Sequence, residues 1–390
     1  MMTKKMLKYA IILGALTALG PLCTDFYLSA LPDMTADLSS SNARAQLTLT
    51  TALIGLGFGQ FIFGPLSDRI GRKKPLLASL LLFIMSSLWC AFTQDMNQLI
   101  LARLIQGVAG AGGAVLSRAI ARDLYNGKAL TNFFALLMTV NGIAPVLAPV
   151  LGSIQLSVTG WRGLFITLAC AGVLMFLASI FGLNETRVKS VSKKKTTTSL
   201  QVLKDRTFIS FSLLQGFMMA GLFAYIGASS YVLQDIYHLT PQHYSMAFAL
   251  NGIGMIISSI LMAKLAHRFS EMRILKITLY VAIFFSAMLL AMFWLNFSLL
   301  LSLSMLFMAV SVCSGICTLS SSLAMQSQGD NSGTASAWMG MMMFAMGGIS
   351  APLTGINGTS GISMATVIFF SYLFAFLIFL YGKNNLGVEK

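Results

Sequence analysis

The chain has 390 residues, of which 56% are hydrophobic and only 10% are charged. A soluble domain carries about 25% charged residues, so this composition cannot cover a water-facing surface and excludes an ordinary soluble protein. In a soluble protein the net charge of +14 would point to nucleic acid, so the placement of the charges has to decide what they do.

Apolar runs of roughly 18 to 25 residues recur along the chain, and each can cross a hydrocarbon core about 30 Å thick. The run from Ala10 to Leu31 is too long for the apolar part of a signal peptide and has no small-residue cleavage site behind it, so it is expected to be the first span. Charges and Gly, Pro or Asn residues bound the runs, which predicts an all-α membrane protein of twelve transmembrane helices. The predicted spans lie near 7–31, 45–66, 75–94, 97–121, 130–155, 163–183, 207–234, 244–265, 273–294, 297–323, 332–355 and 361–382.

A polar segment interrupts this pattern between the sixth and seventh spans. Residues 185–206 are rich in Ser and Thr and hold seven Lys or Arg residues. We therefore expect a basic cytoplasmic linker that is ordered at most in part. It divides the chain into an N-terminal six-helix bundle, residues 1–184, and a C-terminal six-helix bundle, residues 207–390.

The basic residues of the short loops indicate the orientation. If the N-terminus is cytoplasmic, only Arg44 and Arg162 fall outside, and the others fall inside with the linker. These are Lys4, Lys5, Lys8, Arg69, Arg72, Lys73, Lys74, Arg122, Lys128, Lys264, Arg268, Arg273, Lys276 and Lys383. The positive-inside rule then predicts an even number of spans with both termini in the cytoplasm. The basic charge thus encodes topology, and we expect no nucleic-acid partner.

Two short segments recur at nearly the same offset. The run Ala148–Gly152 of the fifth span resembles Ala351–Gly355 of the eleventh, 203 residues later. The run Leu66–Ile70 after the second span resembles Leu265–Phe269 after the eighth, 199 residues later. Each match pairs span n with span n+6, which indicates a parallel duplication into two pseudo-symmetric bundles. Such an arrangement places a substrate site between the bundles near mid-membrane.

Asp25 is the only acidic residue deep in an apolar span. Burying an ionised carboxylate there costs several kcal/mol, so such a group is usually paired, facing water, or protonated. Pro21, one turn earlier, can bend the helix beside it. We favour a role in proton or substrate coupling, and the alternative is a carboxylate that caps or bonds a neighbouring helix.

Arg103 is the matching basic residue, early in the fourth span. An arginine stays charged in practice, so it must find acceptors, water or a carboxylate. It could lower the pKa of a nearby acid and so couple protonation to cargo. The alternative is an arginine that reaches the outer headgroups, but its companions Gln106 and Gly107 favour the functional interpretation.

The loop between the second and third spans is tight and strongly basic. We expect Gly64 and Gly71 to permit its turn, while Asp68, Arg72 and Asp123 form a charge network that latches the cytoplasmic face in one state. A purely topogenic role for the charge of this loop is equally compatible with the sequence.

Several motifs are absent from the sequence. It contains no Gly-x-x-x-x-Gly-Lys-Ser/Thr loop for ATP phosphates, no His-Glu-x-x-His metal helix and no Gly-x-Ser-x-Gly elbow. The five cysteines lie in apolar runs and the three histidines are scattered, so we expect no metal, no cofactor, no disulfide and no enzymatic activity. We expect a membrane transporter, and without an ATP-binding loop its transport should be driven by an ion gradient.

Four segments together resemble the major facilitator superfamily. The run from Gly64 to Lys74, which includes Asp68, Arg69, Gly71 and Arg72, is similar to the signature between its second and third helices. Arg103-x-x-Gln106-Gly107 resembles its fourth-helix motif, in which the arginine is implicated in proton coupling. Asn141 to Gly152, with Pro145, Ala148, Pro149 and Gly152, resembles its antiporter motif. Asp25 to Pro32 is similar to a first-helix motif.

The pair Ala148-Pro149, where Gly-Pro is usual, resembles the bicyclomycin/chloramphenicol-resistance (Bcr/CflA) branch of the drug:proton antiporters. Trp161-Arg162 and Asn184-Glu185-Thr186 fit that branch as well. Two positions depart from the pattern of this family. Thr17 stands where some multidrug members carry a second acidic residue, and Ser29 stands where proline is common.

The resemblance implies a bacterial inner-membrane antiporter that exports small amphipathic drugs in exchange for protons by alternating access. Asp25 would carry the proton and Arg103 would tune it. The cargo would contact Phe26, Tyr27, Asn141, Phe217, Tyr225 and Asn251. We expect a monomer whose partners are its cargo, protons and the lipid bilayer. The alternatives are a dedicated exporter of one metabolite or siderophore and a non-transporting membrane receptor.

Overall fold

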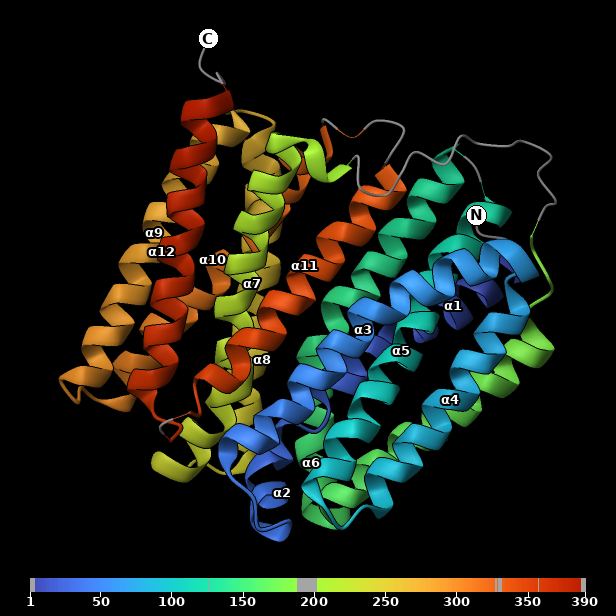
Figure 1. The fold of residues 1–390 in the computed structure, drawn as a ribbon, viewed down its shortest axis with the longest axis horizontal. Coiled ribbons are helices and arrows are strands. Elements are labelled where there is room, and N and C mark those ends of the chain that lie inside the picture. Colours follow the sequence, from blue (N-terminus) through green and yellow to red (C-terminus); the bar gives the residue numbers. More distant parts are fainter. Residues whose placement is uncertain are drawn as a thin grey trace. The chain divides into compact units, whose positions relative to one another are not determined.

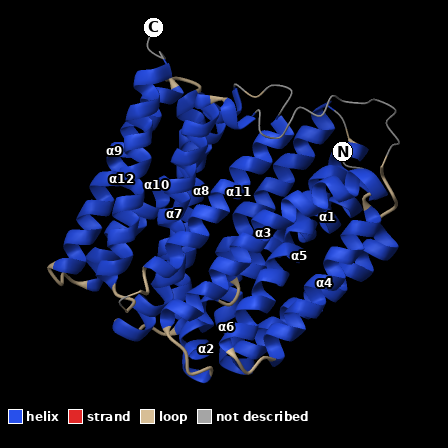
Figure 2. Cartoon of the chain, viewed as in Figure 1, coloured by secondary structure: helices blue, strands red, loops and turns tan. Residues whose placement is uncertain are grey.

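The computed structural model describes residues 4–125, 127–187, 202–326, 328, 332–356 and 358–386. All regular secondary structure in these ranges is helical, as Figures 1 and 2 show, which confirms the predicted all-α class. The chain forms two compact units, Met1–Ser192 and Lys193–Lys390, which we call unit 1 and unit 2.

The described residues of unit 1 form six α-helices of very different length. They are α1 (Lys4–Asp25), α2 (Leu31–Asp37), α3 (Asn42–Ile70), α4 (Lys73–Phe92), α5 (Met96–Leu124) and α6 (Gly127–Gly182). The predicted fifth and sixth spans are the two halves of α6, which meet at a kink at Gly160 (φ 65°). A positive φ of this kind favours glycine. Just past the kink, Trp161 Nε1 (3.1 Å) and Arg162 Nη1 (2.5 Å) both donate to Asp37 of α2.

The first span is not the single helix that its hydropathy predicts. Pro21 lies inside α1, and the break comes four residues later, where α1 ends at Asp25. A short 3-10 helix, Leu28–Ala30, then leads into α2, with Pro32 in its first turn. Proline is tolerated there because the first helical turn leaves its N–H groups unbonded.

The turn between the second and third spans also differs from the prediction. Gly64 does not contribute to it, because α3 continues through Gly64 and Pro65 as far as Ile70. The chain reverses at Gly71 alone, which has a φ of 99°. Gly64 and Pro65 both have low helix propensity, yet α3 stays helical through them.

Unit 2 contains the remaining six α-helices. They are α7 (Arg206–Tyr231), α8 (Pro241–Ala266), α9 (Glu271–Trp294), α10 (Leu299–Gln326), α11 (Ser332–Leu353) and α12 (Gly361–Leu386). Asp205 caps α7 by accepting the backbone N–H groups of Thr207 and Phe208. A π-helical turn, Val232–Ile236, extends α7 at its other end.

The two units repeat the same packing scheme. In unit 1, α5 packs against α1, α3 and α4, and in unit 2 α10 packs against α7, α8 and α9. The α3–α5 contact is close because a Cβ on Gly55 would lie 2.8 Å from the backbone N of Val108. Small residues let helix backbones touch in this way.

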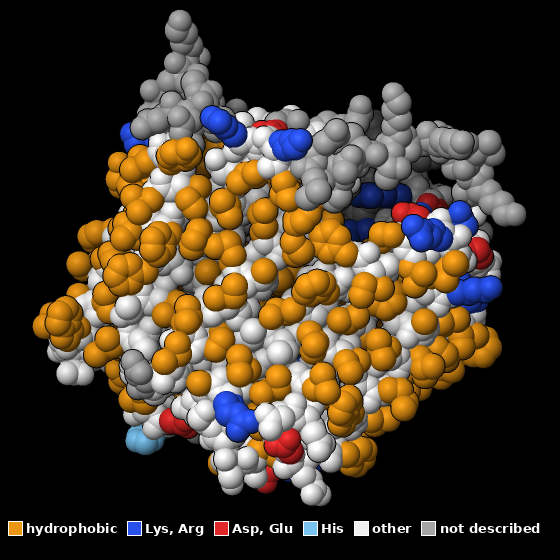
Figure 3. Space-filling view, viewed as in Figure 1, with side chains coloured by type: hydrophobic (Ala, Val, Ile, Leu, Met, Phe, Trp, Pro, Cys, Tyr) orange, Lys and Arg blue, Asp and Glu red, His pale blue; other side chains and the backbone are white. Residues whose placement is uncertain are grey.

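Both units have surfaces suited to lipid. Ten helical segments among the described residues are long and apolar enough to cross a membrane. Figure 3 shows apolar side chains along the helices of each unit, with charged side chains near the helix ends. Helices pair their own backbone N–H and C=O groups, which hydrocarbon cannot do.

Candidate functional site

The break after α1 holds the predicted acid of unit 1. Asp25, the last residue of α1, and the two residues after it, Phe26 and Tyr27, are exposed by 6%, 5% and 0% respectively. Helix α6 approaches this break at Gly152, where a Cβ would overlap the carbonyl oxygen of Phe26. The structure thus brings the first-helix motif and the end of the antiporter motif into direct contact.

Arg103 of α5 is completely buried in unit 1 and does not reach its surface. Its guanidinium carbon lies 4.3 Å from the ring centroid of Tyr27 and 5.7 Å from that of Phe165. Nη1 donates to Gln106 Oε1 and lies 3.4 Å from Cys23 Sγ. The charge is therefore held by two aromatic faces, an amide and a thiol, and desolvation strengthens such cation–π contacts.

The guanidinium of Arg103 keeps unused donors. Nε and Nη2 have no hydrogen-bond partner within the described part of the chain. The three ion pairs found among the described residues do not include Arg103 or Asp25. An arginine cannot shed its proton in a protein, so these N–H groups favour an oxygen acceptor.

The predicted charge network forms at the end of unit 1 where α3 ends and α4 begins. Arg72 Nη1 lies 2.5 Å from Asp68 Oδ1, and Arg72 Nε lies 2.8 Å from Asp123 Oδ2 near the end of α5. The Asp68 side chain is 66% exposed and that of Asp123 only 17%. The pair with Asp123 is therefore the stronger one, since exposure screens an ion pair.

The other residues predicted for the latch have different positions. Arg69 joins the cluster through its carbonyl oxygen, which accepts a hydrogen bond from Arg187 Nη1 at 2.6 Å. Gly71 forms the turn itself. Gly64 lies inside α3, where a Cβ would make an ordinary 3.8 Å contact with Val115.

Sequence reasoning missed a residue of this cluster, Glu185, which follows α6. Its carboxylate accepts the backbone N–H groups of Arg72 (2.8 Å), Lys73 (3.1 Å), Thr186 (3.1 Å) and Arg187 (3.0 Å). Partial burial opposes ionisation of this carboxyl, but the four N–H groups outweigh it and lower its pKa. The only sequence signal was the run around Glu185 that fits the Bcr/CflA branch.

In unit 2, the predicted cargo residues Tyr225 and Asn251 bind each other. Asn251 Nδ2 donates to Tyr225 Oη at 2.8 Å. The Tyr225 ring stacks on Phe248 with 5.5 Å between centroids, and all three side chains are buried. Each of the two polar groups is thus satisfied inside unit 2.

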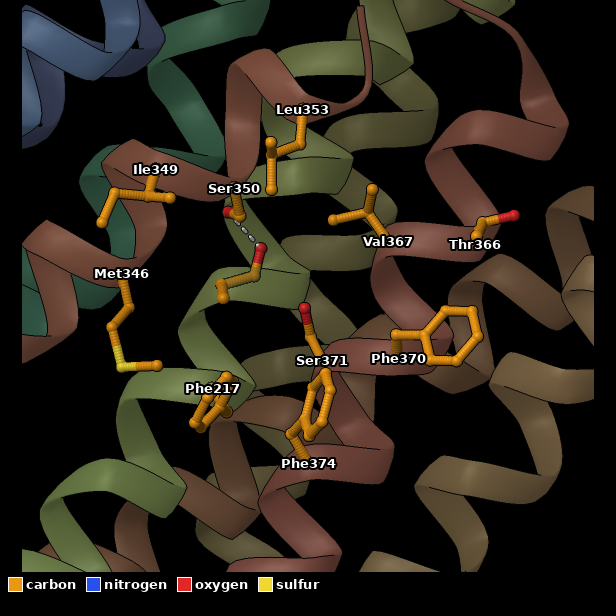
Figure 4. A pocket seen from close by; sticks show the side chains of 11 residues that line it. Phe217, Met346, Ile349, Ser350, Leu353, Thr366, Val367, Phe370, Ser371 and Phe374 are labelled. Carbon is orange, nitrogen blue, oxygen red and sulfur yellow. Dashed lines mark hydrogen bonds between the residues drawn. The ribbon is translucent and has the colours of Figure 1, made fainter. Parts of the chain in front are cut away.

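Phe217 of α7 lines a cavity of about 280 Å³ in unit 2, shown in Figure 4. Its ring lies 5.5 Å from that of Phe374 of α12. The Ser350 hydroxyl at the wall is turned onto the carbonyl of Ala220, at 2.6 Å, so it presents little polarity to the cavity. The remaining lining residues are Met346, Ile349, Leu353, Thr366, Val367, Phe370 and Ser371. The walls suit an apolar group.

The other residues of the antiporter motif lie on α6. Pro145 and Pro149 are inside the helix, and Ala148 is fully buried. The side chain of Asn141 lies outside those that the structure describes.

Comparison with known proteins adds the family context. A family model described as "Major Facilitator Superfamily" matches residues 13–352. An uncharacterized MFS-type transporter of Bacillus subtilis, YdgK, is 37% identical over 96% of this chain and 95% of its own. A bicyclomycin resistance protein homolog of Haemophilus influenzae is 28% identical over 88% of both chains. The multidrug resistance protein MdtL of Salmonella is 29% identical over 63% of both.

Solved structures share the fold. A bacterial homolog of the lysosomal transporter Spinster, in an inward-facing and occupied conformation, has a TM-score of 0.79 over 96% of both chains at 16% identity. A D-xylose-proton symporter has a TM-score of 0.76 over 95% of this chain and 97% of its own, at 13% identity.

Proposed function

Because the chain belongs to the Major Facilitator Superfamily, we propose that it exports small amphipathic drugs across the bacterial inner membrane in exchange for protons. It is a multi-pass membrane transporter, and its bicyclomycin-resistance and multidrug-resistance relatives support the Bcr/CflA type. In this proposal it acts as a monomer with twelve spans in two six-helix bundles and both termini in the cytoplasm. The kink at Gly160 supports the count, since it makes two spans of α6.

The arrangement around Asp25 carries the proposal. Arg103 contacts Cys23 and Tyr27, the residues two positions before and two after Asp25, and still has two unpartnered donors. Asp25 itself is buried where α1 breaks. A carboxylate that loses its proton here gains an attraction to Arg103, and one that is protonated loses it. The charge of Asp25 can thereby be coupled to the geometry of the break.

Alternating access requires an element that favours one state over the other. We assign this role to the latch residues Asp68, Arg72 and Asp123, with Gly71 as the turn and Arg69 as a backbone acceptor. Their network joins the end of α3, the start of α4 and the end of α5 at one end of unit 1. The basic charge of this end supports its placement on the cytoplasmic side. Gly64 contributes packing rather than the turn.

For the cargo, we propose the residues Phe26, Tyr27, Asn141, Phe217, Tyr225 and Asn251. The apolar cavity beside Phe217 supports a contact with the apolar part of an amphipathic molecule. The Tyr225–Asn251 pair would bind cargo by exchanging their mutual hydrogen bond for bonds to the ligand. The Tyr27 ring also faces Arg103 and is fully buried, so its contact with cargo requires the break after α1 to open.

The experiment that tests export uses inverted membrane vesicles from a pump-deficient bacterium expressing this chain. A susceptibility screen, with bicyclomycin included, selects the compounds for uptake assays. We expect uptake that a proton gradient drives and an uncoupler abolishes. Uptake of a single metabolite alone would identify a dedicated exporter. Specific binding without movement of any compound would instead support a receptor and contradict the proposal.

A further inference from the structure

We propose that Glu185 is the positioning residue of the latch. Its carboxylate lies just after α6 and caps the start of α4. The cap offsets the positive charge of Arg72 at that helix start, and Arg72 in turn binds Asp68 and Asp123. The inference rests on the latch role proposed above and adds to it a residue from the segment that follows α6.

Two of the four backbone N–H groups that Glu185 accepts belong to the start of α4. Glu185 Oε1 accepts the N–H of Arg72 at 2.8 Å, and Oε2 accepts the N–H of Lys73 at 3.1 Å. These are two of the backbone N–H groups that a helix start leaves without an intrahelical partner. One carboxylate from outside the helix thus does what a capping side chain normally does from within.

An external anion is needed because the latch charges lie at unfavourable helix ends. Arg72 directly precedes α4 and Asp123 lies one residue before the end of α5. A helix macrodipole favours anions at its N-terminus and cations at its C-terminus, so both latch residues have the opposite sign. Glu185 places a negative charge at the start of α4 and offsets that of Arg72.

Glu185 is also tied to the other side of the latch. The next residue, Thr186, donates from its hydroxyl to Asp123 Oδ2 at 3.3 Å. The same carboxylate oxygen accepts Arg72 Nε at 2.8 Å. A single short segment after α6 therefore contacts both partners of the Arg72–Asp123 pair.

Unit 2 provides an internal comparison. Its equivalent of Arg72, 199 residues later, is Glu271, the first residue of α9. Glu271 accepts hydrogen bonds from Ser322 (2.9 Å) and Gln326 (2.8 Å) in the last turns of α10. The same two helix ends are joined, but here the acid belongs to the helix start itself. In unit 1 an arginine occupies that position, and the acid comes from Glu185.

The turn before α4 is shaped to admit this carboxylate. A Cβ at Gly71 would lie 2.6 Å from Glu185 Oε2, closer than real Cβ contacts allow. With its φ of 99°, Gly71 meets two demands at once, the backbone turn and the space for the acid.

The first measurement is hydrogen–deuterium exchange on the purified full chain. With Glu185→Ala, we expect amide exchange in residues 71–76 to rise about fivefold, the ratio that loss of one helix cap gives. The start of α9, residues 270–276, should be unchanged. Asn184→Ala is the matched control, because Asn184 is exposed in the same segment. Unchanged exchange in 71–76 would overturn the capping role, whether or not the chain transports drugs.

The second measurement asks whether Glu185 acts through the latch. Initial transport rates are compared for Glu185→Gln, Asp123→Asn and the double variant. We expect Glu185→Gln to lower the rate about fivefold alone and to have no further effect in the Asp123→Asn background, since residues of one network are not additive. Equal reductions in both backgrounds would show that Glu185 acts independently of the latch and would overturn the inference.

Discussion

At the scale of single residues, the charged groups of unit 1 could be found from sequence, but their partners could not. Asp25 and Arg103 stand out because charges are costly in an apolar span. That Tyr27 stacks on Arg103 depends on how α1 breaks beside α5, and no spacing along the chain reveals it. Phe165, the second aromatic face, was missed for the same reason.

The contacts of Arg103 with two aromatic rings and Gln106 lead to a testable prediction. Arg103→Lys keeps the charge but loses the planar group that stacks on Tyr27 while bonding Gln106. We expect proton-driven transport to fall about tenfold, equivalent to about 1.4 kcal/mol, since a compact ammonium cannot contact both aromatic rings and Gln106 at once. Arg44→Lys, at an exposed arginine of α3, is the control and should keep its rate. A wild-type rate for Arg103→Lys in vesicles would show that charge alone suffices.

At the scale of helices, hydropathy predicted where the apolar runs lie but not where they break. Apolar residues lie on both sides of Asp25 within the run from Ala10 to Leu31, so mean hydropathy does not show that α1 ends there. The predicted fifth and sixth spans fall on the two halves of α6, which join at a kink at Gly160 rather than through a loop. Breaks of this kind depend on backbone packing between helices, such as that of Gly152 on Phe26.

The contact of Gly152 with Phe26 can be tested by substitution. Gly152→Ala should destabilise the protein by about 1–3 kcal/mol, because the added methyl meets backbone and forces α6 away from the break. Gly20→Ala in α1, where the methyl would lie 3.8 Å from Leu56, should be neutral or stabilising. Thermal unfolding in detergent compares them. Equal unfolding temperatures for both variants and the wild type would contradict the close approach.

At the scale of the whole molecule, the internal repeat was the most informative part of the sequence. The matched segments at offsets of 199 and 203 predict that unit 2 repeats unit 1, and the packing of α10 in unit 2 does repeat that of α5 in unit 1. Among the described residues, the buried charged residues of unit 1 are not repeated in unit 2. The intramembrane Asp25 and Arg103 lie in unit 1, whereas the described cavity lies in unit 2. We therefore propose that unit 1 carries the proton and that the cavity of unit 2 contacts the apolar part of the cargo.

The measurement that tests the account most directly is transport by purified protein in proteoliposomes, comparing wild type with Asp25→Asn. The asparagine keeps the size of the side chain but cannot carry the proton. We predict that Asp25→Asn loses transport driven by a pH gradient while still exchanging labelled for unlabelled compound without one. Full gradient-driven transport by Asp25→Asn would contradict the assignment of Asp25 as the coupling group.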